Sequence, residues 1–270
     1  MKVPDQLAHS IRARWPERAE SWLARVGPEL DELTRQHSAT PQRVLPARYA
    51  FVVSAISPDA PLIFRASADP AALEQAAVAE VLGRLGVGPM VHCSTSTNTG
   101  LWTVMDQVVP GTPLADADPR SLDIDALAQP LRVLAGQRAP RPDLPHISDW
   151  LRARLIDDNL SDLPSGEQVA HKGERVGALR ILNDLTSDML PGLCHGDASP
   201  WNVLAGHEGR WTLIDPRGMQ GEVEYDAAVV AYKLGRFLTV PDAEVKVAEA
   251  SGLALDRIAA WTLVGKAARV

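Results

Sequence analysis

The segment 195–215 constrains the fold more than any other part of the sequence. Two apolar runs, 203–204 and 211–214, flank a Gly-containing connection, and this pattern predicts a short β-hairpin. Asn202 enters the first run and Asp215 leaves the second, so the hairpin would bring these two side chains together. Amide and carboxylate oxygens are hard ligands of the kind that Mg²⁺ takes alongside substrate phosphates. The segment therefore predicts a phosphoryl-transfer site.

A third polar residue, Asp197, lies on the loop that precedes the hairpin. The step from Asp197 to Asn202 equals that of the kinase catalytic loop His-x-Asp-x-x-x-x-Asn, and His195 fills the His position. Because phosphoryl transfer chiefly needs a positioned acceptor hydroxyl and neutralised phosphate charge, Asp197 is the expected base and Asn202 and Asp215 the expected magnesium ligands. His195 is expected to brace the loop. The alternative is an Asx-capped turn before a core strand.

The composition limits the classes of partner. The 270 residues carry a net charge of -7 and are 46% hydrophobic, which suits a packed core and argues against a nucleic-acid or anionic-membrane surface. No apolar run approaches the length of a membrane span, and the first 22 residues lack the apolar core of a signal peptide. Two cysteines, Cys93 and Cys194, fit a reducing cytoplasm. We therefore expect a cytoplasmic protein with a small-molecule partner.

The order of the expected elements predicts two lobes. Two helices over 4–37, split near Gly27 and Pro28, precede strand-like runs and one helix over 70–85, and the chain after Pro110 is mainly helical. This order predicts an α+β, bilobal, protein-kinase-like fold. Residues 1–110 would form a small β-rich N-lobe preceded by helices, which binds the nucleotide, and residues 111–270 a helical C-lobe with the catalytic loop, the metal and the acceptor site.

Residues 195–204 and 213–226 together resemble the aminoglycoside phosphotransferase family. The variant over 214–226, with the segment 255–263, is similar to the branch of streptomycin 6-phosphotransferase and hydroxyurea phosphotransferase. The resemblance implies a protein-kinase-like fold that binds ATP or another NTP between lobes and phosphorylates small-molecule hydroxyls. It also implies that Asp226 is a structural acid.

The same resemblance assigns roles by position in the rest of the site. It implies ATP and Mg²⁺ as cofactors, Asp197 as the catalytic base, and Asn202 and Asp215 as the metal ligands. The hinge beside the adenine falls on the segment formed by Met105, Asp106, Gln107 and Val108.

The nucleotide half of the site departs from this pattern. Arg65 stands where such kinases have a lysine, and a planar guanidinium differs from a compact ammonium. Glu74 falls on the apolar stripe of the helix over 70–86, and a carboxylate on a buried face needs a partner, so we expect it to face Arg65. The alternative is a rotated helix with a solvated Glu74. The Walker P-loop motif is absent, which excludes that fold.

The acceptor is the least constrained part of the prediction. Glu222 and Glu224 follow the magnesium loop and could pair with a cationic acceptor, and Trp201 within the catalytic loop could line the substrate cleft. An aminoglycoside such as streptomycin, and hence antibiotic resistance, is the first hypothesis. The alternatives are a metabolite or biosynthetic-intermediate kinase of the same fold, or a pseudokinase weakened by Arg65. The oligomeric state is not predicted.

Overall fold

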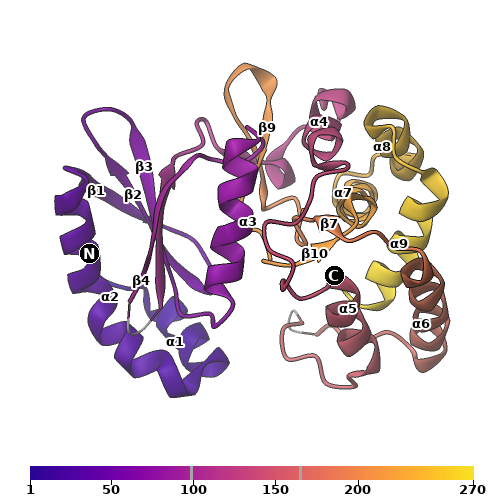
Figure 1. Ribbon diagram of the computed structural model, residues 1–270, viewed down its shortest axis with the longest axis horizontal. Coiled ribbons are helices and arrows are strands. Elements are labelled where there is room, and N and C mark those ends of the chain that lie inside the picture. The colour runs from indigo at the N-terminus through magenta and orange to yellow at the C-terminus, as the bar shows by residue number, and fades with distance from the viewer. Residues whose placement is uncertain (98–99, 164–165) are drawn as a thin grey trace. The chain divides into compact units, whose positions relative to one another are not determined.

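The computed structural model describes residues 1–97, 100–163 and 166–270 (Figure 1). The chain divides into two compact units, Met1–Val108 and Val109–Val270. The fold class matches the prediction, because the first unit is built on an antiparallel sheet and the second is mainly helical. Among the described helices, none combines the length and the apolar character that a membrane crossing requires.

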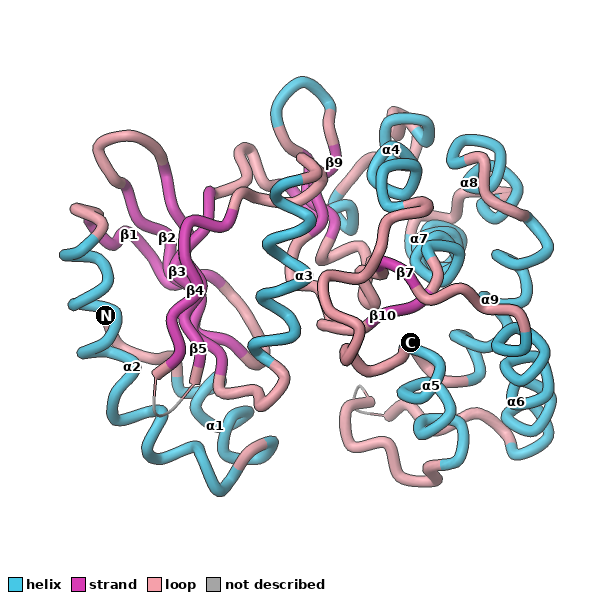
Figure 2. The backbone as a smooth tube through the Cα atoms, viewed as in Figure 1, coloured by secondary structure: helices cyan, strands magenta, loops and turns pink. Residues whose placement is uncertain are grey.

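The N-terminal unit is an antiparallel sheet with helices on both faces (Figure 2). Its five strands run in the spatial order β1-β2-β3-β5-β4, and helix α3 contacts β4 and β5. The elements are α1 (Asp5–Arg14), α2 (Pro16–Gln36), β1 (Thr40–Leu45), β2 (Ala50–Ile56), β3 (Pro61–Ser67), α3 (Ala72–Arg84), β4 (Val91–Ser96) and β5 (Leu101–Asp106).

The side chains of β3 alternate between the core face of the sheet and the opposite face, which carries Arg65. Leu62, Phe64 and Ala66 are buried in the core cluster formed with α1 and α2. Because side chains alternate along a strand, Ile63 and Arg65 project from the opposite face, which α3 contacts.

The expected break between the first two helices is wrong in position. The chain breaks at Trp15, and α2 then runs through Pro28 to Gln36. Pro16 explains the shift, because proline fits the first position of a helix and disfavours helical backbone in the residue before it.

The C-terminal unit packs its helices around α7. Figure 1 shows α7 end-on between α4, α8 and α9, and all three contact it. The helices are α4 (Ile124–Leu134), α5 (Ile147–Ile156), α6 (Lys172–Ser187), α7 (Val223–Phe237), α8 (Ala243–Ser251) and α9 (Leu255–Ala267), with 3₁₀ turns at Leu114–Asp116 and His207–Gly209.

Two small sheets in this unit carry the loop identified from the sequence. One contains β6 (Thr112–Pro113), β8 (Val203–Ala205) and β9 (Trp211–Leu213), and the other pairs β7 (Gly192–Leu193) with β10 (Gln220–Gly221). The loop 194–202 therefore runs from one sheet to the other.

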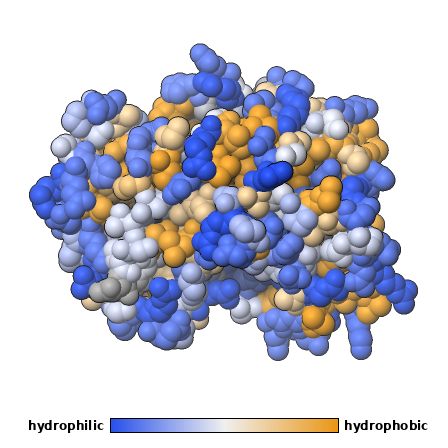
Figure 3. All heavy atoms as spheres, viewed as in Figure 1, coloured by the Kyte–Doolittle hydropathy of each residue, from blue (hydrophilic) through white to orange (hydrophobic). Residues whose placement is uncertain are grey.

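The surface carries scattered apolar groups among hydrophilic ones, as the face in Figure 3 shows. Single exposed apolar side chains are normal in folded proteins. Trp201 differs because it is 63% exposed and lies directly before Asn202 in the loop 194–202.

Candidate active site

The carboxylate of Asp226 fixes the start of the loop 194–202. Asp226 lies in the first turn of α7 and is fully buried. Its Oδ2 accepts a hydrogen bond from the His195 amide at 2.7 Å, and its Oδ1 accepts one from the Gly196 amide at 2.8 Å. Burial raises the pKa of Asp226, while these two hydrogen bonds act in the opposite direction. Asp226 thus ties the catalytic loop to the central helix.

His195 connects the loop to the hairpin. The ring is fully buried, its Nε2 lies 2.9 Å from the carbonyl oxygen of Ile214, and the Asp197 amide donates to its Nδ1 at 3.3 Å. A neutral imidazole with the proton on Nε2 satisfies both contacts, since one nitrogen faces an acceptor and the other a donor. These contacts give His195 the bracing position expected from the sequence. The adjacent Cys194 thiol is also buried, which raises its pKa.

Arg217 holds one oxygen of Asp197. Its Nη2 donates to Asp197 Oδ2 at 3.0 Å, its Nε donates to the Gly196 carbonyl at 3.0 Å, and its amide donates to the His195 carbonyl at 2.9 Å. The Asp197 side chain is 33% exposed, and within the described parts of the chain no hydrogen bond reaches its Oδ1. One carboxylate oxygen is therefore anchored, and the other is available to a ligand.

The hairpin of β8 and β9 brings Asn202 and Asp215 to the same end. Val203 pairs with Leu213, and the Ile214 amide donates to the Asn202 carbonyl at 2.9 Å. The register thus places Asp215 one residue beyond the partner of Asn202. Asp215 is exposed and adopts a left-handed backbone with φ of 56°.

The donor set at this end suits Mg²⁺. The Asn202 Nδ2 donates to the Asp197 carbonyl at 3.0 Å, so its Oδ1 points away from that carbonyl, and the described residues place no hydrogen bond on it. In the described ranges, no three His, Cys, Asp or Glu side chains cluster as a metal cage. A site with an amide, a carboxylate and few other protein ligands fits a cation that keeps waters and binds substrate phosphates. Asn202 and Asp215 would hold the ion.

Arg65 has a different partner from the one expected. Its Nη2 donates to Gln75 Oε1 at 3.1 Å, and the Gln75 amide donates to Asp69 Oδ2 at 3.0 Å. Glu74 Oε2 is buried, and within the described chain it has neither a hydrogen bond nor an ion pair with Arg65. The predicted Arg65–Glu74 pair is therefore wrong, because α3 turns the neighbouring residue toward β3. Since successive helical residues point about 100° apart, one position decides the partner.

The hinge residues Met105, Asp106, Gln107 and Val108 lie at the end of β5 and directly after it. The Asp106 amide donates to the Met90 carbonyl and the Gln107 amide to the Pro61 carbonyl, each at 2.9 Å. His92 Nε2 lies 2.6 Å from Asp106 Oδ1. A ligand that binds this segment through its backbone would therefore use groups other than these two amides.

Glu222 is engaged by the protein itself. Arg257 donates to both of its oxygens, with Nη2 at 2.7 Å from Oε1 and Nε at 3.1 Å from Oε2, and Trp261 Nε1 donates to Oε2 at 3.0 Å. The Glu222 side chain is only 10% exposed. The charge of Glu222 is thus compensated within the fold, and contact between Glu222 and a substrate stays a prediction.

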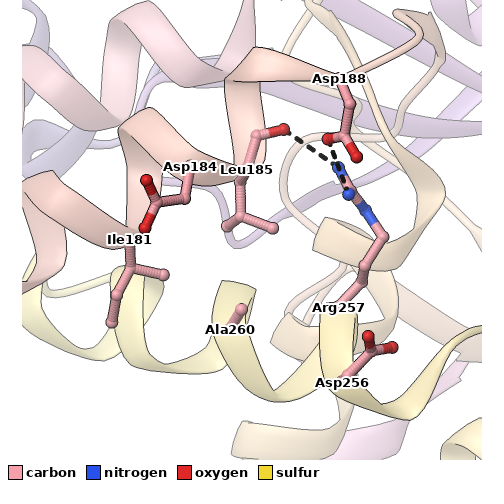
Figure 4. Close-up of a pocket in the computed structure, with 7 residues that line it drawn as sticks. All are labelled: Ile181, Asp184, Leu185, Asp188, Asp256, Arg257 and Ala260. Atoms are coloured by element: carbon pink, nitrogen blue, oxygen red, sulfur yellow. Dashed lines mark hydrogen bonds and ion pairs between the residues drawn. The ribbon is translucent and has the colours of Figure 1, made fainter.

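Arg257 continues from Glu222 into a cavity between α6 and α9. Figure 4 shows Arg257 reaching Asp188 and the Leu185 carbonyl, with donor–acceptor distances of 3.0 and 3.1 Å. The cavity has a volume of about 300 Å³, and its lining is Ile181, Asp184, Leu185, Asp188, Asp256, Arg257 and Ala260. It contains none of the residues assigned to phosphoryl transfer, so we do not place the substrate there.

Glu224 keeps a more open carboxylate than Glu222. It lies in the first turn of α7 and is partly buried, and burial raises its pKa. Its own backbone and the charge of Arg257 act to lower that pKa, and the charge of Glu222 acts with burial to raise it. Glu224 and the exposed Trp201 remain the side chains through which this unit could contact an acceptor.

Arg217 and the Trp150 ring that it contacts were not among the predicted site residues. The Arg217 Cζ lies 4.1 Å from the centroid of the Trp150 ring. The available signal was a cation two residues after a predicted metal ligand, but the partners of Arg217 depend on the pairing of β7 with β10, which returns the chain to His195.

Comparison with known proteins agrees with this geometry. A sequence model described as "Phosphotransferase enzyme family" matches residues 47–261. A search of curated proteins found no match.

The fold is similar to solved structures of small-molecule kinases. An aminoglycoside-3'-phosphotransferase of type VIII has 22% identity and a TM-score of 0.62, over 88% of this chain and 97% of that chain. Choline kinase LicA from Streptococcus pneumoniae has 13% identity and a TM-score of 0.63, over 88% and 86%. A spectinomycin phosphotransferase in complex with ADP and spectinomycin has 15% identity and a TM-score of 0.58, over 90% and 86%. These likenesses confirm the protein-kinase-like fold.

Proposed function

The chain belongs to the phosphotransferase enzyme family, and on this premise we propose that it transfers the γ-phosphoryl group of ATP to a hydroxyl of a small molecule. The observation that carries the proposal is the difference between the two carboxylate oxygens of Asp197. Arg217 anchors its Oδ2, while Oδ1 stays open beside the end of the hairpin that carries Asn202 and Asp215. A carboxylate held in this way can orient one hydroxyl without being displaced.

The chemistry follows from these positions. The acceptor hydroxyl donates its hydrogen bond to Asp197 Oδ1, which directs a lone pair of the hydroxyl oxygen at the γ-phosphorus. The new oxygen–phosphorus bond forms as the bond to the β–γ bridging oxygen breaks, the hydroxyl proton passes to Asp197, and ADP leaves. Asn202 and Asp215 would hold Mg²⁺, which would neutralise charge on the phosphates.

The nucleotide half of the proposal lies in the N-terminal unit. We assign residues 1–110 to nucleotide binding and residues 111–270 to catalysis and acceptor binding. Arg65 would contact phosphate from β3, with its guanidinium oriented by Gln75, and the segment 105–108 would contact the adenine. Glu74 is no longer required as the partner of Arg65. Nucleotide use is supported by the ADP in the spectinomycin phosphotransferase structure.

The acceptor that we propose is cationic, with an aminoglycoside of the streptomycin type as the first candidate. The net charge of -7, the open carboxylate of Glu224 and the exposed ring of Trp201 support this choice. The segments 214–226 and 255–263 carry the similarity to the streptomycin branch. An enzyme of this kind would confer antibiotic resistance from the cytoplasm.

A second candidate is a kinase for a small metabolic amino alcohol. It is favoured by the fold likeness to choline kinase LicA and to a choline/ethanolamine kinase family protein from Mesorhizobium loti, which has 16% identity and a TM-score of 0.66. Both candidates need the same base and metal ligands, so the acceptor alone separates them.

The proposal is tested by measuring ADP release with streptomycin, hydroxyurea, choline and simple amino alcohols, with the product identified by mass spectrometry. Asp197→Asn should lower turnover by about 10²–10⁴-fold, the usual contribution of a positioned base. The matched control is Asp184→Asn, an exposed carboxylate on α6 that should leave turnover unchanged. Undiminished product formation by Asp197→Asn would overturn the assignment. Binding of ATP without phosphorylation of any acceptor would instead favour the pseudokinase hypothesis.

A further inference from the structure

Helix α5 packs against the catalytic loop through its first residues. Its first residue, Ile147, lies so close to Gly221 that a Cβ at residue 221 would meet the Ile147 side chain at 2.5 Å. A Cβ at Gly196 would meet the same side chain at 3.8 Å. Because helical residues three apart share a face, Trp150 follows Ile147 toward the same loop.

The ring of Trp150 contacts the guanidinium that anchors Asp197. The Arg217 Cζ lies 4.1 Å from the ring centroid, well within the range of a cation–π interaction. The same guanidinium donates to Asp197 Oδ2 and to the Gly196 carbonyl, each at 3.0 Å. The guanidinium of Arg217 therefore has three contacts, two through hydrogen bonds and one through the ring of Trp150.

The ring of Trp150 also contacts a second cation, the guanidinium of Arg154. The Arg154 Cζ lies 4.9 Å from the Trp150 centroid, and the Arg154 side chain is only 9% exposed. Arg154 donates to the Ala268 carbonyl at 2.9 Å and to Asp162 Oδ2 at 2.6 Å. Because Arg154 is held by these bonds, the ring of Trp150 has a rigid neighbour.

From these contacts we infer that Trp150 is a positioning residue for the catalytic base, acting through Arg217. Two hydrogen bonds to one guanidinium still allow its plane to rock, and rocking would move the Nη2 that anchors Asp197. The ring blocks this motion and so leaves Oδ1 aimed at the acceptor hydroxyl. This inference rests on the proposed function, because it assigns Asp197 the role of base.

The test is a double-mutant cycle in the ADP-release assay. Trp150→Leu should lower kcat by about 3- to 30-fold, the range expected for loss of one partly desolvated cation–π contact, with the KM for ATP changed by less than about twofold. Trp150→Phe and Trp150→Tyr keep a ring and should recover most of the activity. In an Arg217→Ala background, Trp150→Leu should cause almost no further loss, because the residue through which it acts is gone.

The controls separate positioning from stability. Trp15→Leu removes a half-buried tryptophan from the N-terminal unit, where its ring contacts Tyr49 with a centroid distance of 5.7 Å, and should leave kcat unchanged. If Trp150→Leu fails to fold, Trp150→Met retains apolar volume without a π face and should show the same loss of kcat.

The outcomes distinguish this inference from the proposed function. Equal losses from Trp150→Leu with and without Arg217 would show a merely structural ring and overturn the inference alone. A wild-type kcat in a folded Trp150→Leu or Trp150→Met variant would do the same. A wild-type protein that phosphorylates no acceptor would overturn the proposed function, and this inference with it.

Discussion

The substitution Asp226→Asn changes one atom in the link between α7 and the catalytic loop. Both carboxylate oxygens accept backbone amides, from His195 at 2.7 Å and from Gly196 at 2.8 Å, and Asp226 is fully buried. An asparagine offers one acceptor oxygen and one NH₂ donor, so one of the two amides would face another donor. Loss of one hydrogen bond to a charged group is worth about 1.5–3 kcal/mol, and a buried donor left unsatisfied adds to the loss.

We therefore expect Asp226→Asn to lower the free energy of unfolding of the C-terminal unit by about 2–4 kcal/mol. Burying a neutral group in place of a charged one offsets part of the loss of hydrogen bonding. Turnover should fall as well, because the displaced amide belongs to the residue before Asp197. The measurement is urea unfolding followed by tryptophan fluorescence, with the transition of each unit fitted separately.

The pH dependence gives a second signature of the same substitution. Burial raises the pKa of Asp226 above the value in the unfolded chain, so the unfolded state releases this proton first as pH rises. The wild-type protein therefore loses stability between the unfolded pKa and the raised pKa, and Asp226→Asn lacks this loss. The stability difference between the two proteins should shrink as pH rises through that window. A midpoint and a pH slope equal to those of the wild type would refute the role of Asp226 as the anchor.

Four further substitutions test other contacts of the site. Glu222→Gln should destabilise the C-terminal unit by about 1–3 kcal/mol with little change in the KM for the acceptor, because it removes a charge-assisted contact with the protein itself. Glu224→Gln should raise the KM for a cationic acceptor, and it should abolish the rise in wild-type KM as pH falls through the pKa that burial raises, both measured in initial-rate assays. Gly196→Ala should inactivate the enzyme in the same assay, because φ is 78° and the new Cβ would lie 2.9 Å from the Arg217 Cβ. Asp215→Ala should raise the Mg²⁺ concentration needed for half-maximal rate, read from a magnesium titration of turnover.

The hairpin of the candidate site was predictable because its information is local. Two apolar runs, a connection with glycine and polar residues at both strand ends are all visible within residues 202–215, and the structure forms β8 and β9 in that register. The partners of Asp197 and Glu222 were not predictable in this way. Arg217 meets Asp197 because β7 pairs with β10, and Arg257 meets Glu222 across 35 residues, because α9 packs on α7.

The errors in the N-terminal unit have the same physical origin. The apolar stripe predicts that one face of α3 is buried, but it fixes the rotation of a helix only to within about one residue, and that residue separates Glu74 from Gln75. Pro28 predicts a helix break, but tertiary packing carries α2 through it, with Val26 and Leu30 fully buried on either side. Local sequence patterns thus predict the helices and strands, whereas tertiary packing determines which side chains contact each other.

The first turn of α7 connects the packing of α9 to the position of the catalytic loop. Glu222 at its start is held by Arg257 and Trp261 from α9, and Asp226 four residues later holds the amides of the catalytic loop. Because a helical turn is rigid, fixing one end of it fixes the other, so packing between α7 and α9 determines where the loop begins. Arg217 acts from the other side of that loop, where it sets the carboxylate of Asp197. The backbone of the loop and the side chain of Asp197 are therefore positioned by separate contacts, which explains how the proposed base can be partly exposed and still be held in place.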